Sequence, residues 1–284
     1  MRLRSVFTAR RHSGCHDALK INPAPAVKLE ITDLAYTYAG RTSVRALDGV
    51  TLVISDNEFL AIVGPVGCGK TTLLRCVAGL LRPARGTITC DGAPVVGPSP
   101  QRGFVFQEEA LFPWMTVADN LAFGLQAQGV EASRQRALVD EMIDLLGLRG
   151  FERAYPKDLS GGMVKMVEVA RVLIVDPALL LLDEPFGLLD AQTRVRMQDV
   201  LIGLWEKRTK TVILVTHDIE EAVYLADRVV VFSSRPGRVK AEVRVDFPRP
   251  RRPAMRYTAA FLELKKQIWD RLDAGSGEIR DGGR

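Results

Sequence analysis

The octapeptide Gly64–Thr71 constrains this chain more than any other stretch of its sequence. Its residues, Gly-Pro-Val-Gly-Cys-Gly-Lys-Thr, fit the pattern G-x-x-x-x-G-K-[ST] at every fixed position. An apolar run at residues 59–63 precedes it and a helix-like run follows, so the glycines fall where a strand meets a helix. Glycines allow the strained turns that aim successive N–H groups at phosphate oxygens, and the helix N-terminus adds its positive dipole. The pattern favours a phosphate-binding loop over a glycine-rich turn that binds nothing.

Two side chains of this loop have predicted roles in nucleotide binding. Lys70 would reach the β- and γ-phosphates, and the Thr71 hydroxyl would hold Mg²⁺. The predicted nucleotide-binding residues of this stretch are Gly64, Pro65, Val66, Gly67, Cys68, Gly69, Lys70, Thr71 and Thr72.

A pair of carboxylates follows a second apolar run. Four leucines at residues 179–182 predict a buried parallel strand, and Asp183 and Glu184 come at its carboxyl end. In a chain that already has a phosphate-binding loop, Asp183 would hold Mg²⁺ directly or through water. Glu184 would orient and deprotonate an attacking water. A surface pair without a role is the weaker interpretation because the leucines bury the strand.

Three further features are ambiguous from their residues alone. Leu159-Ser160-Gly161-Gly162 suits either a plain helix N-cap with a turn or an anion site at a helix N-terminus. His217 follows an apolar strand at 211–216 and is either a packing residue or part of the ligand-binding strand edge that holds Asp183. Tyr38, at the end of a predicted strand, is either a half-buried strand aromatic or a stacking platform.

The remaining pattern predicts an α/β chain with a helical insertion. Residues 29–38 and 46–54 alternate between polar and apolar and predict an antiparallel hairpin. Residues from about 108 to 158 are predicted to be largely helical, with a capping box beginning at Thr116 and a C-cap at Gly147. The apolar Leu-Phe-Pro-Trp at 111–114 suits a docking surface or core packing equally.

Charge and composition narrow the function classes. The 284 residues carry a net charge of +5 and a 47% hydrophobic fraction, which is ordinary for a globular protein with a substantial core. The excess positive charge lies in residues 1–20 and in the four arginines of 248–256. Nucleic acid is therefore not an expected partner, and solvated tails or attraction to an anionic membrane face account for the charge.

Targeting and cysteine patterns point to the cytosol. The apolar runs are far shorter than the ~20 residues that cross a bilayer, and residues 1–20 lack the apolar core of a secretory signal. Residues 1–20 predict a disordered basic extension, with an organellar transit segment as the alternative. Cys15, Cys68, Cys76 and Cys90 have neither C-x-x-C spacing nor paired histidines, which argues against a metal site or a disulfide framework.

Taken in order, these motifs resemble those of the ATP-binding subunits of ABC transporters, from about Leu29 to Leu272. The resemblance covers the P-loop, a glutamine loop at Gln107, the signature 159–162, the strand ending in Asp183-Glu184, a D-loop with Leu189-Asp190, and the switch histidine His217. Within this family the chain is most similar to the nitrate, sulfonate and taurine importer ATPases. This similarity lies in Phe106-Gln107 and in residues 111–114, 185–187 and 189–194.

The resemblance implies a P-loop, RecA-like core with an antiparallel β subdomain and an inserted helical subdomain. It also implies that Tyr38 stacks on adenine and that Gln107 contacts Mg²⁺ while coupling the site to a membrane partner. Glu184 would be the general base, with His217 and Lys70 as further catalytic residues. Ser160, Gly161 and Gly162 of one subunit would close over the ATP of a second copy in a head-to-tail dimer.

The same resemblance implies where the protein works. ATP and Mg²⁺ are the expected cofactors. The expected partners are membrane-spanning permease subunits and, indirectly, a solute-binding protein. The chain would be a peripheral protein on the cytoplasmic face of the cell membrane, and its hydrolysis of ATP would power the import of a small anion or organic solute.

Several residues depart from the family pattern. Val66 stands where a serine is common, and Leu188 replaces a small D-loop residue. After the signature, Val164, Lys165, Met166 and Glu168 replace a more basic, glutamine-containing run. We expect these positions near the dimer interface, where they would affect how well the dimer closes.

The predicted boundaries are a basic extension at 1–26, an ATPase domain at 27–247, and a Pro/Arg linker, C-terminal helix and flexible tail at 248–284. One alternative is a non-transport ABC ATPase acting on nucleic acid or ribosomes, for which two cassettes or a long coiled coil would be expected. The other is a regulatory subunit with weak or no hydrolysis, against which Asp183, Glu184 and His217 argue.

Overall fold

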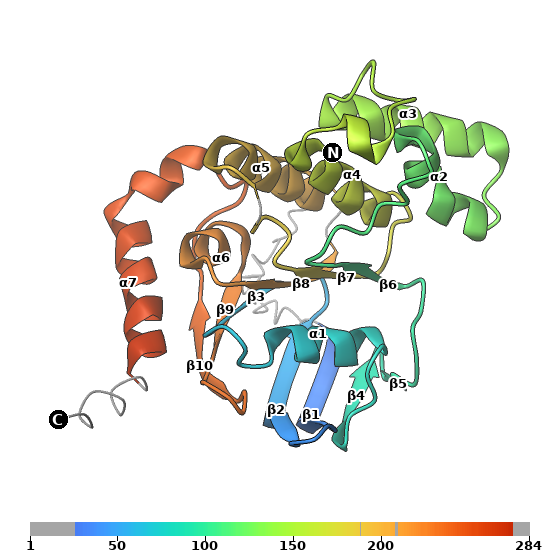
Figure 1. Ribbon diagram of the computed structural model, residues 1–284. Coiled ribbons are helices and arrows are strands. Elements are labelled where there is room, and N and C mark those ends of the chain that lie inside the picture. The colour runs from blue at the N-terminus through green and yellow to red at the C-terminus, as the bar shows by residue number, and fades with distance from the viewer. Residues whose placement is uncertain (1–25, 188, 208–209, 275–284) are drawn as a thin grey trace, which may run out of the picture.

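A six-stranded sheet forms the centre of the computed structural model, which describes residues 26–187, 189–207 and 210–274 (Figure 1). Its strand order is β10-β9-β3-β8-β7-β6. All neighbouring strands are parallel except β9 and β10, which are antiparallel. The strands are β3 (Phe59–Val63), β6 (Arg102–Val105), β7 (Leu179–Asp183), β8 (Thr211–Thr216), β9 (Arg228–Phe232) and β10 (Val239–Arg244).

Both faces of the sheet are buried at its central strands β3, β7 and β8, which explains why these strands are nearly continuous apolar runs. Successive side chains of a strand point to opposite faces. Phe59, Ala61 and Val63 of β3 accordingly belong to one hydrophobic cluster, and Leu60 and Ile62 belong to another. A strand with two covered faces needs apolar residues at every position rather than at alternate ones.

A smaller antiparallel sheet covers part of one face, in the order β2-β1-β4-β5. The predicted hairpin is confirmed, with β1 (Val27–Tyr38) paired to β2 (Val44–Ser55). The remaining strands are β4 (Arg85–Cys90) and β5 (Ala93–Pro94). Helix α1 (Lys70–Ala78) lies between the two sheets, and its Leu73 and Leu74 share a hydrophobic cluster with Leu29 and Ile31 of β1 (Figure 1).

The other face of the large sheet carries α4 (Gly161–Leu173), α5 (Ala191–Lys207) and α6 (Ile219–Leu225), as Figure 1 shows. Helix α7 (Ala259–Asp273), the predicted C-terminal helix, runs beside β9 and β10 and buries Phe261 and Ile268. The predicted α/β fold is therefore confirmed.

Two helices project beyond the edge of the large sheet (Figure 1). Helix α2 (Val117–Ala127) starts at the capping box predicted for Thr116, and α3 (Ala132–Leu146) ends at Gly147 in the left-handed conformation. A short 3₁₀ helix, Pro156–Asp158, follows. These elements occupy the range predicted as a helical insertion. Helix α4, which follows them in the chain, packs against α2.

The basic stretch after β10 corrects one expectation. The arginines of 248–256 were expected to be solvated, but Arg251 and Arg256 are 5% and 7% exposed. Arg249 pairs with Asp227 at 2.7 Å and lies 4.0 Å from the centre of the Trp205 ring. A 3₁₀ helix, Pro253–Tyr257, separates this stretch from α7. The stretch is held to the core because acidic and aromatic side chains of α5 and the α6–β9 connection compensate its charges.

Some predictions lie outside the described residues. They are the basic extension up to residue 25, the tail from residue 275 and the departure at Leu188. Among the residues that the structure describes, no helix has the length and apolar character that crossing a membrane requires.

Candidate functional site

The loop Gly64–Gly69 joins β3 to α1, as its sequence pattern predicts, and its backbone requires glycine. Gly67 and Gly69 have φ values of 74° and 107°, which side-chain-bearing residues rarely adopt. A Cβ on Gly64 would lie 2.9 Å from the Cβ of Phe232 and 3.0 Å from Cys68 Sγ. The loop is therefore packed closely from behind where it leads into the start of α1.

Lys70 and Val66 of this loop differ sharply in burial. Lys70 is 5% exposed, and its Nζ donates to the carbonyl oxygens of Gly64 at 2.8 Å and Pro65 at 3.0 Å. Its charge thus lies inside the loop, where a phosphate would bind. Val66 is 93% exposed, so the absence of a serine hydroxyl at this position removes no internal hydrogen bond. Burial raises the pKa of the Cys68 thiol, which keeps it protonated and unreactive.

Thr71 and Asp183 meet at the carboxyl edge of the large sheet. The Thr71 hydroxyl donates to Asp183 Oδ1 at 2.9 Å. Asp183 is 1% exposed, and burial raises the pKa of its carboxyl. A buried carboxylate beside a hydroxyl offers the hard oxygen ligands that Mg²⁺ prefers, and a bound cation would offset the cost of burying the charge. The two residues therefore fit the metal that the sequence predicts.

Glu184 lies beside His217 and Gln107. His217 Nδ1 is 3.1 Å from Glu184 Oε2, and Gln107 Nε2 is 3.5 Å from the same oxygen. The Glu184 backbone has φ +46° and donates its N–H to Val215 of β8 at 2.9 Å. This left-handed conformation turns the chain sharply after β7. The structure thus brings together three of the predicted residues, from three separate strand ends.

Tyr38 lies beside the start of α1. Its hydroxyl is 3.1 Å from Thr72 Oγ1, and its ring contacts Tyr36 edge-on with centroids 4.8 Å apart. The side chain is 38% exposed, so part of the ring is open to a ligand. This position is compatible with both interpretations of Tyr38, as a strand aromatic and as a stacking platform.

The signature residues lie apart from this loop. Ser160 caps α4 by accepting from the Met163 N–H at 3.3 Å, and Ser160 and Gly161 are exposed. Helix α4 lies on the opposite face of the large sheet from α1 (Figure 1). Among the described residues, no hydrogen bond joins residues 160–162 to the P-loop of the same chain.

Arg235 contacts the P-loop, a role that the sequence does not predict. Its Nε donates to the carbonyl of Gly67 at 3.0 Å. Gly237 follows two residues later, and a Cβ there would lie 2.2 Å from the carbonyl oxygen of Cys68. The β9–β10 turn therefore supports the P-loop from behind. No local motif marks these residues, because their role depends on a contact across 168 residues of sequence.

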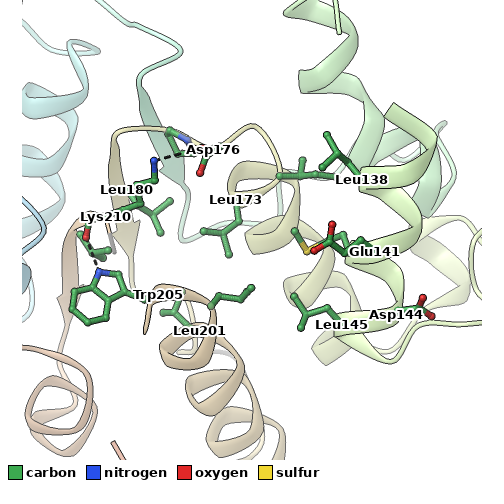
Figure 2. Close-up of a pocket in the computed structure, with 15 residues that line it drawn as sticks. Leu138, Glu141, Asp144, Leu145, Leu173, Asp176, Leu180, Leu201, Trp205 and Lys210 are labelled. Carbon is green, nitrogen blue, oxygen red and sulfur yellow. Dashed lines mark hydrogen bonds and ion pairs between the residues drawn. The ribbon is translucent and has the colours of Figure 1, made fainter. Parts of the chain in front are cut away.

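A cavity of about 430 Å³ lies elsewhere, between α3 and α5. Figure 2 shows its apolar walls, which include Leu138, Leu145, Leu173, Leu201 and Trp205. None of the predicted site residues lines it, so it is separate from the P-loop.

The fold and the site define a P-loop nucleotide-binding protein, and comparison with known proteins identifies its family. Residues 47–187 match the family described as ABC transporter. An uncharacterised ABC transporter ATP-binding protein of Methanocaldococcus jannaschii is 47% identical over 89% of this chain and 94% of its own length.

Two relatives carry transport names. The nitrate import ATP-binding protein NrtD of Synechocystis is 48% identical over 78% of this chain and 83% of its own length. The aliphatic sulfonates import ATP-binding protein SsuB of Bacillus licheniformis is 48% identical over 80% of this chain and 86% of its own length.

A solved structure agrees with these relatives. The dimeric post-hydrolysis state of an ATP-binding cassette bound to ADP and Pi matches with a TM-score of 0.70 and 29% identity. The match covers 78% of this chain and all of that one. The chain belongs to the ABC transporter ATP-binding proteins, and it is an ATP-binding ATPase of that class.

Proposed function

We propose that this protein hydrolyses ATP to power an importer of a small anion or organic solute. The observation that carries the proposal is the meeting of Glu184 and His217, 3.1 Å apart, at the strand edge that also holds Asp183 and the P-loop. The nitrate and sulfonate import names of relatives at 48% identity support the solute class.

The residues of the site would divide the work as follows. The P-loop N–H groups and Lys70 would bind the phosphates, and the exposed part of the Tyr38 ring would stack on the adenine. Thr71 and Asp183 would hold Mg²⁺, with Gln107 near it; the ion would neutralise negative charge on the phosphates. Glu184 would orient and deprotonate the attacking water, and His217 would steady that water and the γ-phosphate.

The active form would be a head-to-tail dimer. Ser160, Gly161 and Gly162 are exposed or half-buried at the start of α4, away from their own P-loop, so they are free to meet ATP on a second copy. The solved relative's dimeric state with ADP and Pi supports a dimer as the active form. ATP would then be part of the interface, and its hydrolysis would weaken the dimer.

The chain would bind separate membrane-spanning permease subunits at the cytoplasmic face of the membrane. A solute-binding protein would deliver the solute to those subunits. Trp114 is 70% exposed and Phe106 is 40% exposed, and both belong to the segment that follows β6. Exposed aromatic residues close to Gln107 in sequence are suited to docking such a partner.

Replacing Glu184 with Gln tests the proposal directly. We expect the variant to retain ATP binding and to lose at least about 100-fold in the rate of phosphate release, since a general base typically contributes that much. Glu220→Gln, a change to a half-buried carboxylate on α6 that pairs with Lys265, is the control. Full turnover in the Glu184 variant would contradict the proposal.

Co-purification of a multi-span membrane protein with the tagged chain would test the transport role.

A further inference from the structure

Helix α4 carries three charged side chains at intervals of three residues, namely Lys165, Glu168 and Arg171. Residues at this spacing share one face of a helix. Here that face meets residues 106–112, the irregular segment that follows β6. Lys165 and Glu168 are 5% and 3% exposed, and they are two of the positions where the chain departs from the family pattern. We expect these positions near the dimer interface, and within one subunit both side chains are buried against residues 106–112.

All three side chains bind the backbone of this segment. Lys165 Nζ donates to the carbonyl oxygens of Phe106 at 2.9 Å and Gln107 at 3.2 Å. Glu168 Oε1 accepts from the Ala110 N–H, and Arg171 Nη2 donates to the Ala110 carbonyl at 2.7 Å. Backbone groups that would be paired in a strand or helix are therefore paired here by side chains of α4.

Within this row Glu168 compensates the charge of Lys165, and Arg171 lies over an aromatic ring. Lys165 Nζ lies 2.8 Å from Glu168 Oε2. The Arg171 guanidinium lies 4.9 Å from the centre of the Phe112 ring, and burial lowers its pKa. A buried ion pair tolerates its desolvation only when both partners are present and hydrogen-bonded, so loss of either charge would leave the other uncompensated. The geometry of the segment thus depends on the pair as a unit.

The segment 106–112 lies between three parts of the proposed ATPase. Gln107 reaches Glu184 at one end, Trp114 is exposed just beyond the other end, and α4 itself begins at the signature cap, Ser160. A displacement of the segment would therefore be transmitted to α4 through charged contacts rather than through one apolar surface, which could slide.

We propose that Lys165 and Glu168 are positioning residues that fix the Gln107 segment to the signature helix, so that the two move as one body when a partner docks at Trp114. We call the contacts of Lys165 and Glu168 with residues 106–110 the clamp. The effect of the clamp on catalysis rests on the proposed ATPase function, but the existence of the clamp does not. Without the clamp, Gln107 would no longer be held beside Glu184, while the P-loop and Tyr38 would be unaffected.

Hydrogen exchange and kinetics on the full chain test the clamp. In Glu168→Ala we expect the amides of residues 106–112 to exchange about tenfold faster, because Ala110 loses its acceptor. We expect kcat for ATP hydrolysis to fall about tenfold with an unchanged KM for ATP, since nucleotide contacts remain. Glu168→Gln keeps an acceptor oxygen for the Ala110 N–H but not the charge that compensates Lys165, so it should restore both properties only in part.

A matched control separates positioning from stability. Glu58→Ala removes a comparable ion pair, Glu58–Arg228 at 2.7 Å, from the start of β3. It should lower the melting temperature without changing exchange at 106–112. If Glu168→Ala does not fold, the double variant Lys165→Met with Glu168→Leu removes both charges together and leaves neither uncompensated.

The readouts distinguish the possible failures. Unchanged exchange at 106–112 in a folded Glu168→Ala or double variant would overturn the inference. So would a loss of kcat that only follows the loss of folded protein. If the unmodified chain proves not to hydrolyse ATP, the proposed function fails, and the exchange measurement still decides whether the clamp exists.

Discussion

His217 Nδ1 lies 3.1 Å from Glu184 Oε2, although 33 residues separate them in sequence. The contact arises because β7 and β8 are parallel neighbours, so their carboxyl ends place both side chains at one edge. Under the proposed function, His217 keeps the Glu184 carboxylate and the reacting water in line.

We therefore expect His217→Ala to reduce kcat for ATP hydrolysis about 100-fold, the effect typical of removing one preorganised polar group. The KM for ATP should change little because the P-loop is untouched. Steady-state phosphate release gives both constants. If the KM for ATP rises while kcat stays unchanged, His217 contributes to ground-state nucleotide binding instead.

Asp183→Asn should raise the melting temperature of the nucleotide-free protein while weakening Mg²⁺ binding. The burial that raises the pKa of Asp183 also penalises its charge, and a neutral amide avoids that penalty. Calorimetry and the Mg²⁺ concentration for half-maximal hydrolysis measure the two effects. Asp176→Asn, a change to an exposed carboxylate, should alter neither. A variant of lower stability with normal Mg²⁺ dependence would show that Asp183 is a structural residue.

Gly64→Ala should destabilise the fold by about 1–3 kcal/mol, as overpacking typically does, and should abolish ATP binding. The added Cβ would meet Phe232 and Cys68 at 2.9 and 3.0 Å, so the loop must shift. Gly97→Ala is a fair control because its Cβ would have no neighbour within 4 Å. Urea unfolding and fluorescence titration with a nucleotide analogue report the two effects. Normal nucleotide binding in Gly64→Ala would mean that the loop tolerates the shift.

Glu221 should make stability depend on pH. It is 4% exposed and faces Thr216, Asp218 and Arg194, and burial raises its pKa from the ordinary 4.5 to about 8. Between these values the folded chain keeps a proton that the unfolded chain releases. The free energy of unfolding therefore falls by up to about 1.4 kcal/mol per pH unit as pH rises through this window, and falls no further above it.

Glu221→Gln should remove this slope and make the protein more stable than the unmodified chain at pH 8. Urea unfolding at pH 6 and pH 8 measures the difference. Glu220→Gln, which changes the more exposed carboxylate next to it, should leave the slope intact. Equal slopes for the unmodified chain and Glu221→Gln would show that Glu221 is ionised in the folded state.

The fold and much of the site follow from local sequence signals. The P-loop glycines, the capping box at Thr116 and the C-cap at Gly147 act within a few residues, so their patterns predict the structure that they form. Asp183 ends one apolar strand and His217 follows the next, and neighbouring parallel strands end at a shared edge.

The contacts that sequence could not predict are those between distant segments. The spacing of Lys165 and Glu168 suggests a pair on one helix face, but nothing local says that the backbone of Gln107 lies opposite. The composition of 248–256 indicates charge without showing that Asp227, Glu206 and aromatic rings compensate it. In both cases the partner comes from another part of the chain.

The support behind the P-loop has a consequence for how the protein folds. A Cβ on Gly69 would lie 2.5 Å from the carbonyl oxygen of Ala46 in β2, and Ala46 accepts from the Gly237 N–H at 2.9 Å. The loop is thus enclosed by strands that precede it and by a turn more than 160 residues later. Contacts of such long range form slowly. During refolding, recovery of nucleotide binding should therefore lag behind the formation of helices, and a nascent chain should acquire its nucleotide site only after the β9–β10 turn has been synthesised.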